Sequence, residues 1–175
     1  MFSATFAYVA PVPFGVALGG HTERTWGHLV TPSYFTTLGV RPSLGRLFDS
    51  QDEHPGQAPN VVISHRFWQE HLGSDSSITG KRLRINGYPA TVIGVGPKEF
   101  LGASPSLFVA DLWLMVSVDA PLAPELAGNA LERRDLTMFQ VVGRLRPGVT
   151  EARAAAALDA VGQSNWRRPI LRRSG

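Results

Sequence analysis

Cysteine is absent from the 175-residue chain, so disulfides and Cys-based zinc sites are excluded. The first 20 residues hold no charged side chain, but Pro11, Pro13 and three glycines interrupt them, and no Lys or Arg precedes them. They lack both the basic start of a signal peptide and the ~20 continuous apolar residues of a membrane helix. We therefore expect a chain that neither spans a membrane nor carries an evident targeting signal.

Basic residues are scarce outside the C-terminal tail, although the net charge is +3. Four of the 17 lie in the last nine positions: Arg167, Arg168, Arg172 and Arg173. Without them, 13 basic residues face 14 acidic ones. A surface that follows nucleic-acid phosphates needs a basic patch on the folded part. The composition argues against nucleic acid as a partner and leaves binding through the tail as a minor alternative.

Motifs for metal and nucleotide binding are also missing. The five histidines show neither an HExxH motif nor paired i, i+4 spacing; they are His21, His28, His54, His65 and His71. The acidic cluster Asp49, Asp52 and Glu53 lacks the alternating ligands and closing glutamate of a calcium loop. Gly94-Val95-Gly96 lacks the third glycine of a dinucleotide fingerprint, and no Walker lysine motif occurs. We expect no metal and no cofactor.

Ser64-His65 is the one pair with the residue types of a nucleophile and its base, but no Gly-x-Ser-x-Gly elbow surrounds it. Adjacent helix residues point apart, so we interpret Ser64 as a helix cap. We expect no catalytic residues and no enzyme, and a small serine hydrolase using Ser64 with a distant histidine stays as the alternative. Trp68 and Trp113 lie within apolar patterns, which favours packing in the core.

With 18 Gly and 13 Pro, the chain favours many short elements. We predict an α+β fold of antiparallel strands with three short helices. Residues 14–30 read as two strands around a polar turn at 21–24, followed by a helix with Thr31 as N-cap, Pro32 as first residue and Gly39 as its end. Residues 41–60 read as an irregular connection. A strand at 61–63 leads through Ser64 into a helix over 65–72 that Gly73 closes.

The second half begins with the best local signal, a hairpin over 82–95 with a type I′ turn at Asn86-Gly87. Strands follow at about 108–116 and at 137–146, with a loop-like or weakly helical stretch at 122–136 between them. Pro147-Gly148 forms a turn, and Thr150 caps a helix. The apolar residues of this helix recur at i, i+3, i+4 and i+7, which predicts one packed face of Ala154, Ala157, Leu158 and Val161.

Several motifs occur in an order that resembles the MacB-like periplasmic core domain of ABC-transporter permeases. They are LVTPSYF at 29–35, LGVRP at 38–42, LGR at 44–46, VVIS at 61–64, FW at 67–68, GKRLRING at 80–87, TVIGV at 91–95, DLWL at 111–114 and VGRLRPGV at 142–149. The resemblance covers about residues 14–162. It marks these as structural motif residues: Tyr34, Phe35, Gly39, Gly45, Arg46, Trp68, Asn86, Gly87, Gly94, Trp113, Gly143, Arg144, Pro147 and Gly148.

The resemblance implies a non-catalytic, extracytoplasmic domain of an exporter on the periplasmic face of the cytoplasmic membrane. It implies one domain over 1–162, with a porter-like lobe (1–60 and 136–162) and an inserted, strand-rich, sabre-like lobe (61–135). Its implied partners are the permease's transmembrane helices, an ABC ATPase, a periplasmic adaptor and a second copy of the chain. The basic tail, 163–175, departs from the family. With no membrane helix at either end, a truncated or frame-shifted gene product or an excised segment is expected.

Overall fold

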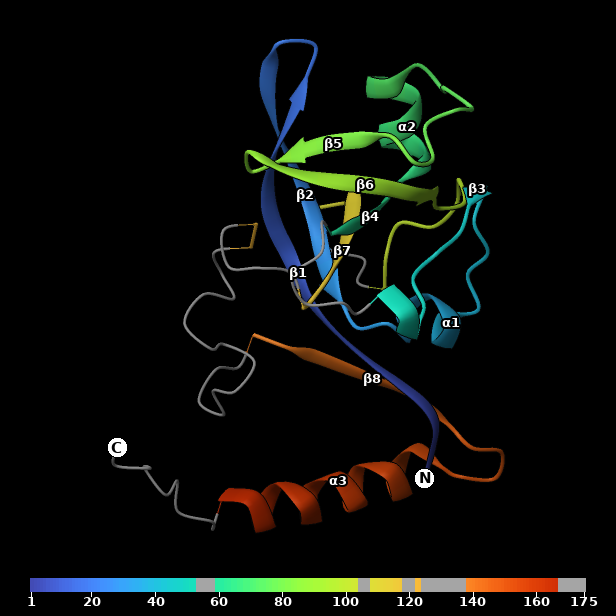
Figure 1. Ribbon diagram of the computed structural model, residues 1–175. Helices are drawn as coiled ribbons and strands as arrows, with labels where there is room; N and C mark the ends of the chain where they lie inside the picture. The colour runs from blue at the N-terminus through green and yellow to red at the C-terminus, as the bar shows by residue number, and fades with distance from the viewer. Residues whose placement is uncertain (53–58, 104–107, 118–121, 124–137, 167–175) are drawn as a thin grey trace. The chain divides into compact units, whose positions relative to one another are not determined.

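The computed structural model describes residues 1–52, 59–103, 108–117, 122–123 and 138–166, with the backbone alone over 161–166 (Figure 1). The chain divides into two compact units. One joins Met1–Ala4 to Gly143–Gly175, and the other is Thr5–Val142. The predicted stretch at 122–136 lies almost entirely outside the described residues. Of the basic tail, 163–175, only 163–166 are described, and they are helical.

Six strands of the Thr5–Val142 unit close into a barrel-like sheet. They are β1 (Phe2–Leu18), β2 (His21–Val30), β4 (Asn60–Ile63), β5 (Arg82–Ile85), β6 (Tyr88–Val95) and β7 (Leu112–Met115). β1 pairs with β2, β2 with β7, β7 with β4, β4 with β6, β6 with β5, and β5 again with β1. The short strand β3 (Leu44–Gly45) pairs with β6 from outside this ring. Closure removes the exposed edges that an open sheet would leave.

The expectation of purely antiparallel strands is corrected by two parallel pairings, β2 with β7 and β4 with β6. Both pairs join strands that are far apart in the chain, so no tight hairpin forces them to run in opposite directions. The α+β class with three α-helices is confirmed in a mixed sheet: α1 (Tyr34–Leu38), α2 (His65–Leu72) and α3 (Glu151–Trp166). α3, with 16 residues, is not the short helix expected.

Strands β4 and β7 divide their side chains between two hydrophobic clusters because successive residues point to opposite sides of a sheet. On β4, Val61 and Ile63 join the first cluster and Val62 the second. On β7, Leu114 joins the first and Trp113 the second. We call the first the interior cluster, since it fills the ring of strands, and the second the outer cluster, which α1 covers with Tyr34 and Phe35.

Local signals at both ends of α2 and at the Asn86-Gly87 turn are confirmed. The Ser64 side chain accepts a hydrogen bond from the Phe67 N–H at 3.0 Å, and Gly73 ends the helix. The β5–β6 hairpin turns at Asn86-Gly87 as predicted. The interpretation of Trp68 and Trp113 as core residues is confirmed too, Trp113 being fully buried and Trp68 partly so.

Several predicted boundaries were wrong, those of the β1–β2 turn and of α1 among them. The β1–β2 turn lies at Gly19-Gly20 rather than at 21–24, because the ladder continues to the pair Leu18–His21. Helix α1 begins after Ser33 instead of Thr31. The Thr31 side-chain oxygen does not cap the helix, because it accepts a hydrogen bond from the Ala7 N–H of β1 at 3.0 Å. Gly39 ends α1 as expected.

The Met1–Ala4 and Gly143–Gly175 unit contains the end of β8 (Gln140–Leu145) and α3. The Arg146 N–H donates to the Met1 carbonyl at 3.0 Å, and the Ser3 hydroxyl donates to the Arg144 carbonyl at 3.1 Å. On α3, Ala154 is buried but Leu158 is 52% exposed. The packed face predicted for this helix is therefore open at Leu158, and the Val161 side chain lies outside the described residues.

The barrel takes strands from both sides of residue 60, since β1 and β2 precede it and β5, β6 and β7 follow it. The division into porter-like and sabre-like lobes stays a prediction. None of the three α-helices, over the residues the structure describes, combines the length and apolarity needed to cross a membrane.

Candidate interaction domain and its motif residues

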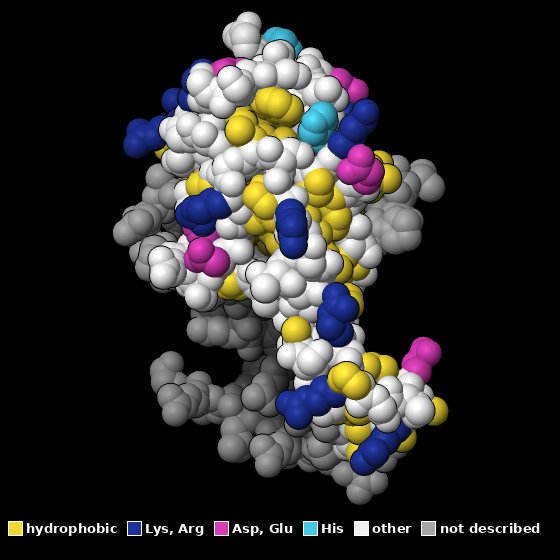
Figure 2. All heavy atoms as spheres, turned by 90° about the vertical axis from the view of Figure 1, so that its right-hand side faces the viewer, with side chains coloured by type: hydrophobic (Ala, Val, Ile, Leu, Met, Phe, Trp, Pro, Cys, Tyr) yellow, Lys and Arg dark blue, Asp and Glu magenta, His cyan; other side chains and the backbone are white. Residues whose placement is uncertain are grey.

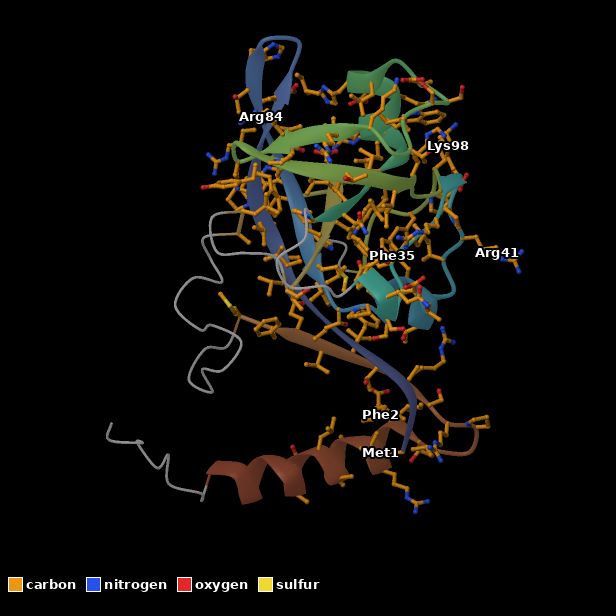
Figure 3. The ribbon with its side chains drawn as sticks, in the orientation of Figure 1. Met1, Phe2, Phe35, Arg41, Arg84 and Lys98 are labelled. Atoms are coloured by element: carbon orange, nitrogen blue, oxygen red, sulfur yellow. The ribbon has the colours of Figure 1, made fainter. Side chains whose placement is uncertain are left out.

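The motif residues Tyr34, Phe35 and Trp113 form the centre of the outer cluster. Phe35 lies between α1 and the barrel (Figure 3), and its ring centroid is 5.6 Å from that of Trp113. The Tyr34 ring is 5.0 Å from Phe35, edge to face, and all three side chains are at most 1% exposed. Aromatic pairs at these distances add to the stabilisation from burial. These residues hold α1 on the barrel and present no reactive group to solvent.

A buried histidine, His28, accompanies these rings and was not singled out by the sequence. Its Nδ1 lies 3.4 Å from the Tyr34 hydroxyl, which also accepts a hydrogen bond from the Ala103 N–H at 2.8 Å. Its Nε2 has no hydrogen-bond partner among the described residues. Burial lowers the pKa of His28 to about 4 and raises the pKa of Tyr34 to about 12, so both side chains are neutral near pH 7.

Gly45, Arg46 and Gly94 mark the place where β3 crosses β6. A Cβ atom on Gly94 would lie 2.0 Å from the Arg46 carbonyl oxygen, and one on Gly45 would lie 2.3 Å from the Ile93 carbonyl oxygen. Only glycine permits this approach of two backbones. The glycine-valine-glycine stretch that resembled the opening of a nucleotide site is thus used for strand packing.

The Arg46 side chain fixes the segment after β3. Its guanidinium group donates to both carboxylate oxygens of Asp52, at 2.7 and 2.6 Å, and the Asn60 amide donates to the same carboxylate at 2.7 Å. Asp52 carries a lowered pKa: burial opposes the shift, but these hydrogen bonds outweigh it. The Arg46 guanidinium also lies 3.9 Å from the Asp49 carboxylate, so Asp49 and Asp52 of the acidic cluster belong to a local ion-pair network. Glu53 lies outside the described residues.

Asn86 and Gly87 form the β5–β6 turn and also help close the barrel. Asn86 lies at φ 49° and Gly87 at φ 84°, as a type I′ turn requires. The Gly15 N–H donates to the Asn86 Oδ1 at 2.8 Å, and the Asn86 N–H donates to the Gly15 carbonyl at 2.7 Å. Since only Val16 and Ala17 of β1 are in register with β5, Asn86 extends this short seam.

Ser64, Arg66 and Trp68 attach α2 to the barrel. Besides capping the helix, Ser64 donates its N–H to the Asp111 carbonyl at 2.7 Å. The Asp111 carboxylate accepts from the Arg66 guanidinium and the Thr25 hydroxyl. The Trp68 Nε1 donates to the Asp75 carbonyl at 2.9 Å. Ser64 is only 4% exposed, and its hydroxyl accepts the capping hydrogen bond of α2. The serine hydrolase hypothesis is therefore without support.

The last four motif residues lie in the other unit or at its edge. Gly143 lies against the Phe2 ring, and a Cβ atom on Gly143 would be 2.5 Å from a carbon of that ring. The Arg146 guanidinium donates to the Phe2 carbonyl at 3.1 Å. Arg144 uses its carbonyl to accept from Ser3. Pro147-Gly148 turns the chain, and the Thr150 side chain accepts from the Arg153 N–H at 3.3 Å at the start of α3. The turn and the cap are as predicted.

No set of three or more His, Asp or Glu side chains able to hold a metal ion occurs within the described ranges. His65 and His71, six residues apart, are not brought together, because His71 lies 3.1 Å from the Glu23 carboxylate and His65 packs against Trp68. What the described residues offer instead is surface. On the side of the Thr5–Val142 unit that carries α1 and β3, hydrophobic side chains gather with basic side chains spaced among them (Figure 2).

A family profile described as the MacB-like periplasmic core domain matches residues 2–161 of the chain. A search of the curated proteins finds no match. Among solved structures, the periplasmic region of MacB from Actinobacillus actinomycetemcomitans is similar with a TM-score of 0.66 and 15% identity, over 94% of this chain and 67% of that one.

Two further solved structures share the fold. A domain of a putative permease protein from Porphyromonas gingivalis gives a TM-score of 0.60 at 18% identity, over 97% of this chain and 66% of that one. The extracellular domain of the noncanonic ABC-type transporter YknZ from Gram-positive bacteria gives 0.61 at 15% identity, over 93% and 77%. The chain thus spans about two thirds of the first two structures.

Proposed function

The chain belongs to the MacB-like periplasmic core domain family, and from this premise we propose that it acts as a non-catalytic docking domain of an ABC exporter. In this function it contacts the substrate, an adaptor or a second copy of itself outside the cytoplasmic membrane. It transmits motion between these contacts and the membrane part of the transporter. ATP hydrolysis belongs to a separate ATPase.

The observation that carries the proposal is the family match over residues 2–161, nearly the whole chain. The use of the motif residues supports it. Tyr34, Phe35 and Trp113 are buried in packing, Gly45 and Gly94 in a strand crossing, and Asn86 in the barrel seam. A domain whose characteristic residues all serve the fold does its work through its surface and its rigidity.

A mechanical role also agrees with how the Thr5–Val142 unit is constructed. Six strands close on themselves around a filled interior, and the outer cluster fixes α1 to the ring. A packed interior transmits displacement because it has low compressibility. We expect the unit to move as one piece when the membrane part of the transporter moves.

The test is crosslinking in membranes of the source cells. A photoreactive amino acid replaces Tyr88 (48% exposed) in the full chain, and crosslinked proteins are identified after detergent extraction. We expect an ABC permease, its ATPase or an envelope adaptor. Placing the probe at buried Val92 (0% exposed) controls for unfolded chain, which alone would crosslink from there. If the probe at Tyr88 crosslinks to soluble cytoplasmic proteins and to no transporter component, the proposal is overturned.

A further inference from the structure

The outward side of β1, between β2 and β5, carries only small side chains. Phe14 and Val16 point into the interior cluster, so Gly15 and Ala17 between and after them point outward. In the registered pairs, Arg24 on β2 lies opposite Gly15, and Arg84 on β5 lies opposite Ala17. Directly paired residues share a face of the sheet. Arg24 and Arg84 therefore flank a row without long side chains.

The same face carries a third arginine and an aromatic pair. Arg82 precedes Arg84 by two residues and points to the same side, and both are exposed (Arg84 is labelled in Figure 3). Trp26, two residues from Arg24, stacks on Phe108 with ring centroids 4.3 Å apart. The Arg24 guanidinium carbon lies 5.1 Å from the centroid of Trp26, and Phe108 is 39% exposed.

The positive charge of this face is not paired within the described part of the chain. Arg24, Arg82 and Arg84 have no ion-pair partner among the described residues, whereas Arg46, Arg66 and Lys81 all have one. The four strands β1, β2, β5 and β6 contain a single acidic residue, Glu23. It lies opposite the inward-pointing Val16, and its carboxylate is 3.1 Å from the His71 Nδ1. Over the residues that the structure describes, the outward face of these strands is therefore positive and carries no acidic side chain of its own.

We propose that this face, defined by Arg24, Trp26, Arg82, Arg84 and Phe108, docks an acidic segment of another protein of the transporter. Guanidinium groups match carboxylates in charge and in planar two-point geometry. Trp and Arg are the residue types that carry most binding energy at protein interfaces. Gly15 and Ala17 place no long side chain between the arginines, and the shorter Thr22 and Asn86 side chains lie over Gly15. The proposal rests on the proposed docking function and names its surface and partner chemistry.

The test uses the full chain and a short glutamate-rich peptide, with the same peptide carrying Gln for each Glu as its neutral counterpart. Binding is followed by NMR amide and indole N–H shifts. We expect saturable shifts centred on the Trp26 indole with the glutamate peptide only. The double variant R24Q/R84Q is expected to bind about fivefold more weakly, from two exposed charge pairs of modest strength.

The matched control is R41Q/K98Q, which removes two positive charges from exposed residues elsewhere in the same unit (Figure 3). We expect its affinity to change less than about twofold, as for charges remote from the contact. Equal weakening of both variants would indicate unspecific attraction and overturn the proposal. So would binding of phosphatidylglycerol vesicles without binding of the peptide, or the absence of binding to the folded chain.

Crosslinking from Tyr88 separates failure of this proposal from failure of the proposed function. If transporter components are recovered equally well from the unmodified chain and R24Q/R84Q, the docking function stands and this surface is wrong. If the unmodified chain recovers none, the docking function itself fails, whatever the peptide does.

Discussion

The two hydrophobic clusters of the barrel differ in the side chains they use. The fully buried members of the interior cluster are aliphatic apart from Phe14 and Phe67, while the outer cluster is built on aromatic rings such as Phe35 and Trp113. The outer cluster also contains polar atoms, those of His28 and the Tyr34 hydroxyl among them. A ring of short strands leaves a narrow interior that branched aliphatic side chains fill, whereas α1 and its loops leave a wider gap that rings span.

The comparison bears on five of the residues that the sequence analysis marked as motif residues. Tyr34, Phe35 and Trp113 lie in the outer cluster, and Gly45 and Gly94 lie at the crossing beside it. Many combinations of Val, Leu and Ile fill a barrel interior, since cores tolerate exchanges of similar volume. Rings packed edge to face and backbones in direct contact tolerate far fewer. We therefore expect substitutions in the outer cluster to be tolerated less well than substitutions in the interior cluster.

Removing the Trp113 ring is expected to reduce the stability of the fold more than any other substitution proposed below. Trp113→Ala should lower the free energy of unfolding by about 4 kcal/mol, because Trp113 is fully buried among Phe35, Phe100 and His28. Its neighbour Leu114→Ala, in the interior cluster, should cost about 3 kcal/mol. Urea unfolding followed by circular dichroism measures both. A larger loss for Leu114→Ala would show that the interior, and not the outer layer, is the less replaceable one.

Adding a methyl group where β3 crosses β6 is expected to cause the second-largest loss of stability. Gly94→Ala places a Cβ 2.0 Å from the Arg46 carbonyl oxygen, so the strands must separate, at about 3 kcal/mol. Gly96→Ala is the matched control: its Cβ would meet nothing nearer than the Trp113 ring at 3.5 Å, and it should cost less than about 1 kcal/mol. Thermal unfolding of the two variants measures the difference. Equal stabilities would contradict the claim that the contact between β3 and β6 requires glycine at position 94.

The buried histidine gives the outer cluster a pH dependence that the interior lacks. Burial lowers the pKa of His28 to about 4, so the unfolded chain takes up this proton at a higher pH than the folded chain does. Stability is full above the unfolded pKa of about 6.5 and falls as the pH drops from there to about 4. This group alone should remove roughly 2–3 kcal/mol by about pH 4.5.

His28→Phe keeps a ring in place and should flatten that part of the profile. Urea unfolding of both proteins at several values between about pH 7 and about pH 4.5 measures the difference, since carboxylates contribute equally to both. Parallel profiles would show that His28 already titrates normally in the folded chain.

The two helices on the barrel give the smallest and sharpest contrast. α2 seats Phe67 in the interior cluster and is capped by Ser64, so Ser64→Ala should cost about 1 kcal/mol. α1 has no side-chain cap, and the Ser33 hydroxyl instead makes an exposed hydrogen bond to the Thr5 carbonyl. Ser33→Ala should therefore cost less than about 0.5 kcal/mol. Hydrogen exchange of the first-turn amides tests this, and equal effects would contradict the assignment of the caps.

The sequence by itself determined the features that depend on neighbouring residues. The Ser64 cap, the Asn86-Gly87 turn, the strand at 61–63 and the end of α1 at Gly39 are all confirmed, since each follows from backbone preferences within a few residues. The ordered motifs also identified the family correctly.

Only the tertiary structure decided how the strands pair and which face each side chain takes. A register shift between Val9 and Val12 reverses the sides of β1, so Tyr8 joins the outer cluster and Phe14 the interior one. Pro11 lies at this shift, and proline within a strand is typical of bulges, but it does not indicate which side of the sheet each half of the strand takes. Barrel closure, the parallel pairs and the gathering of Arg24 and Arg84 on one face join residues distant in the chain. Their energies come from packing and from pairing across strands, which the order of residues along the chain does not reveal.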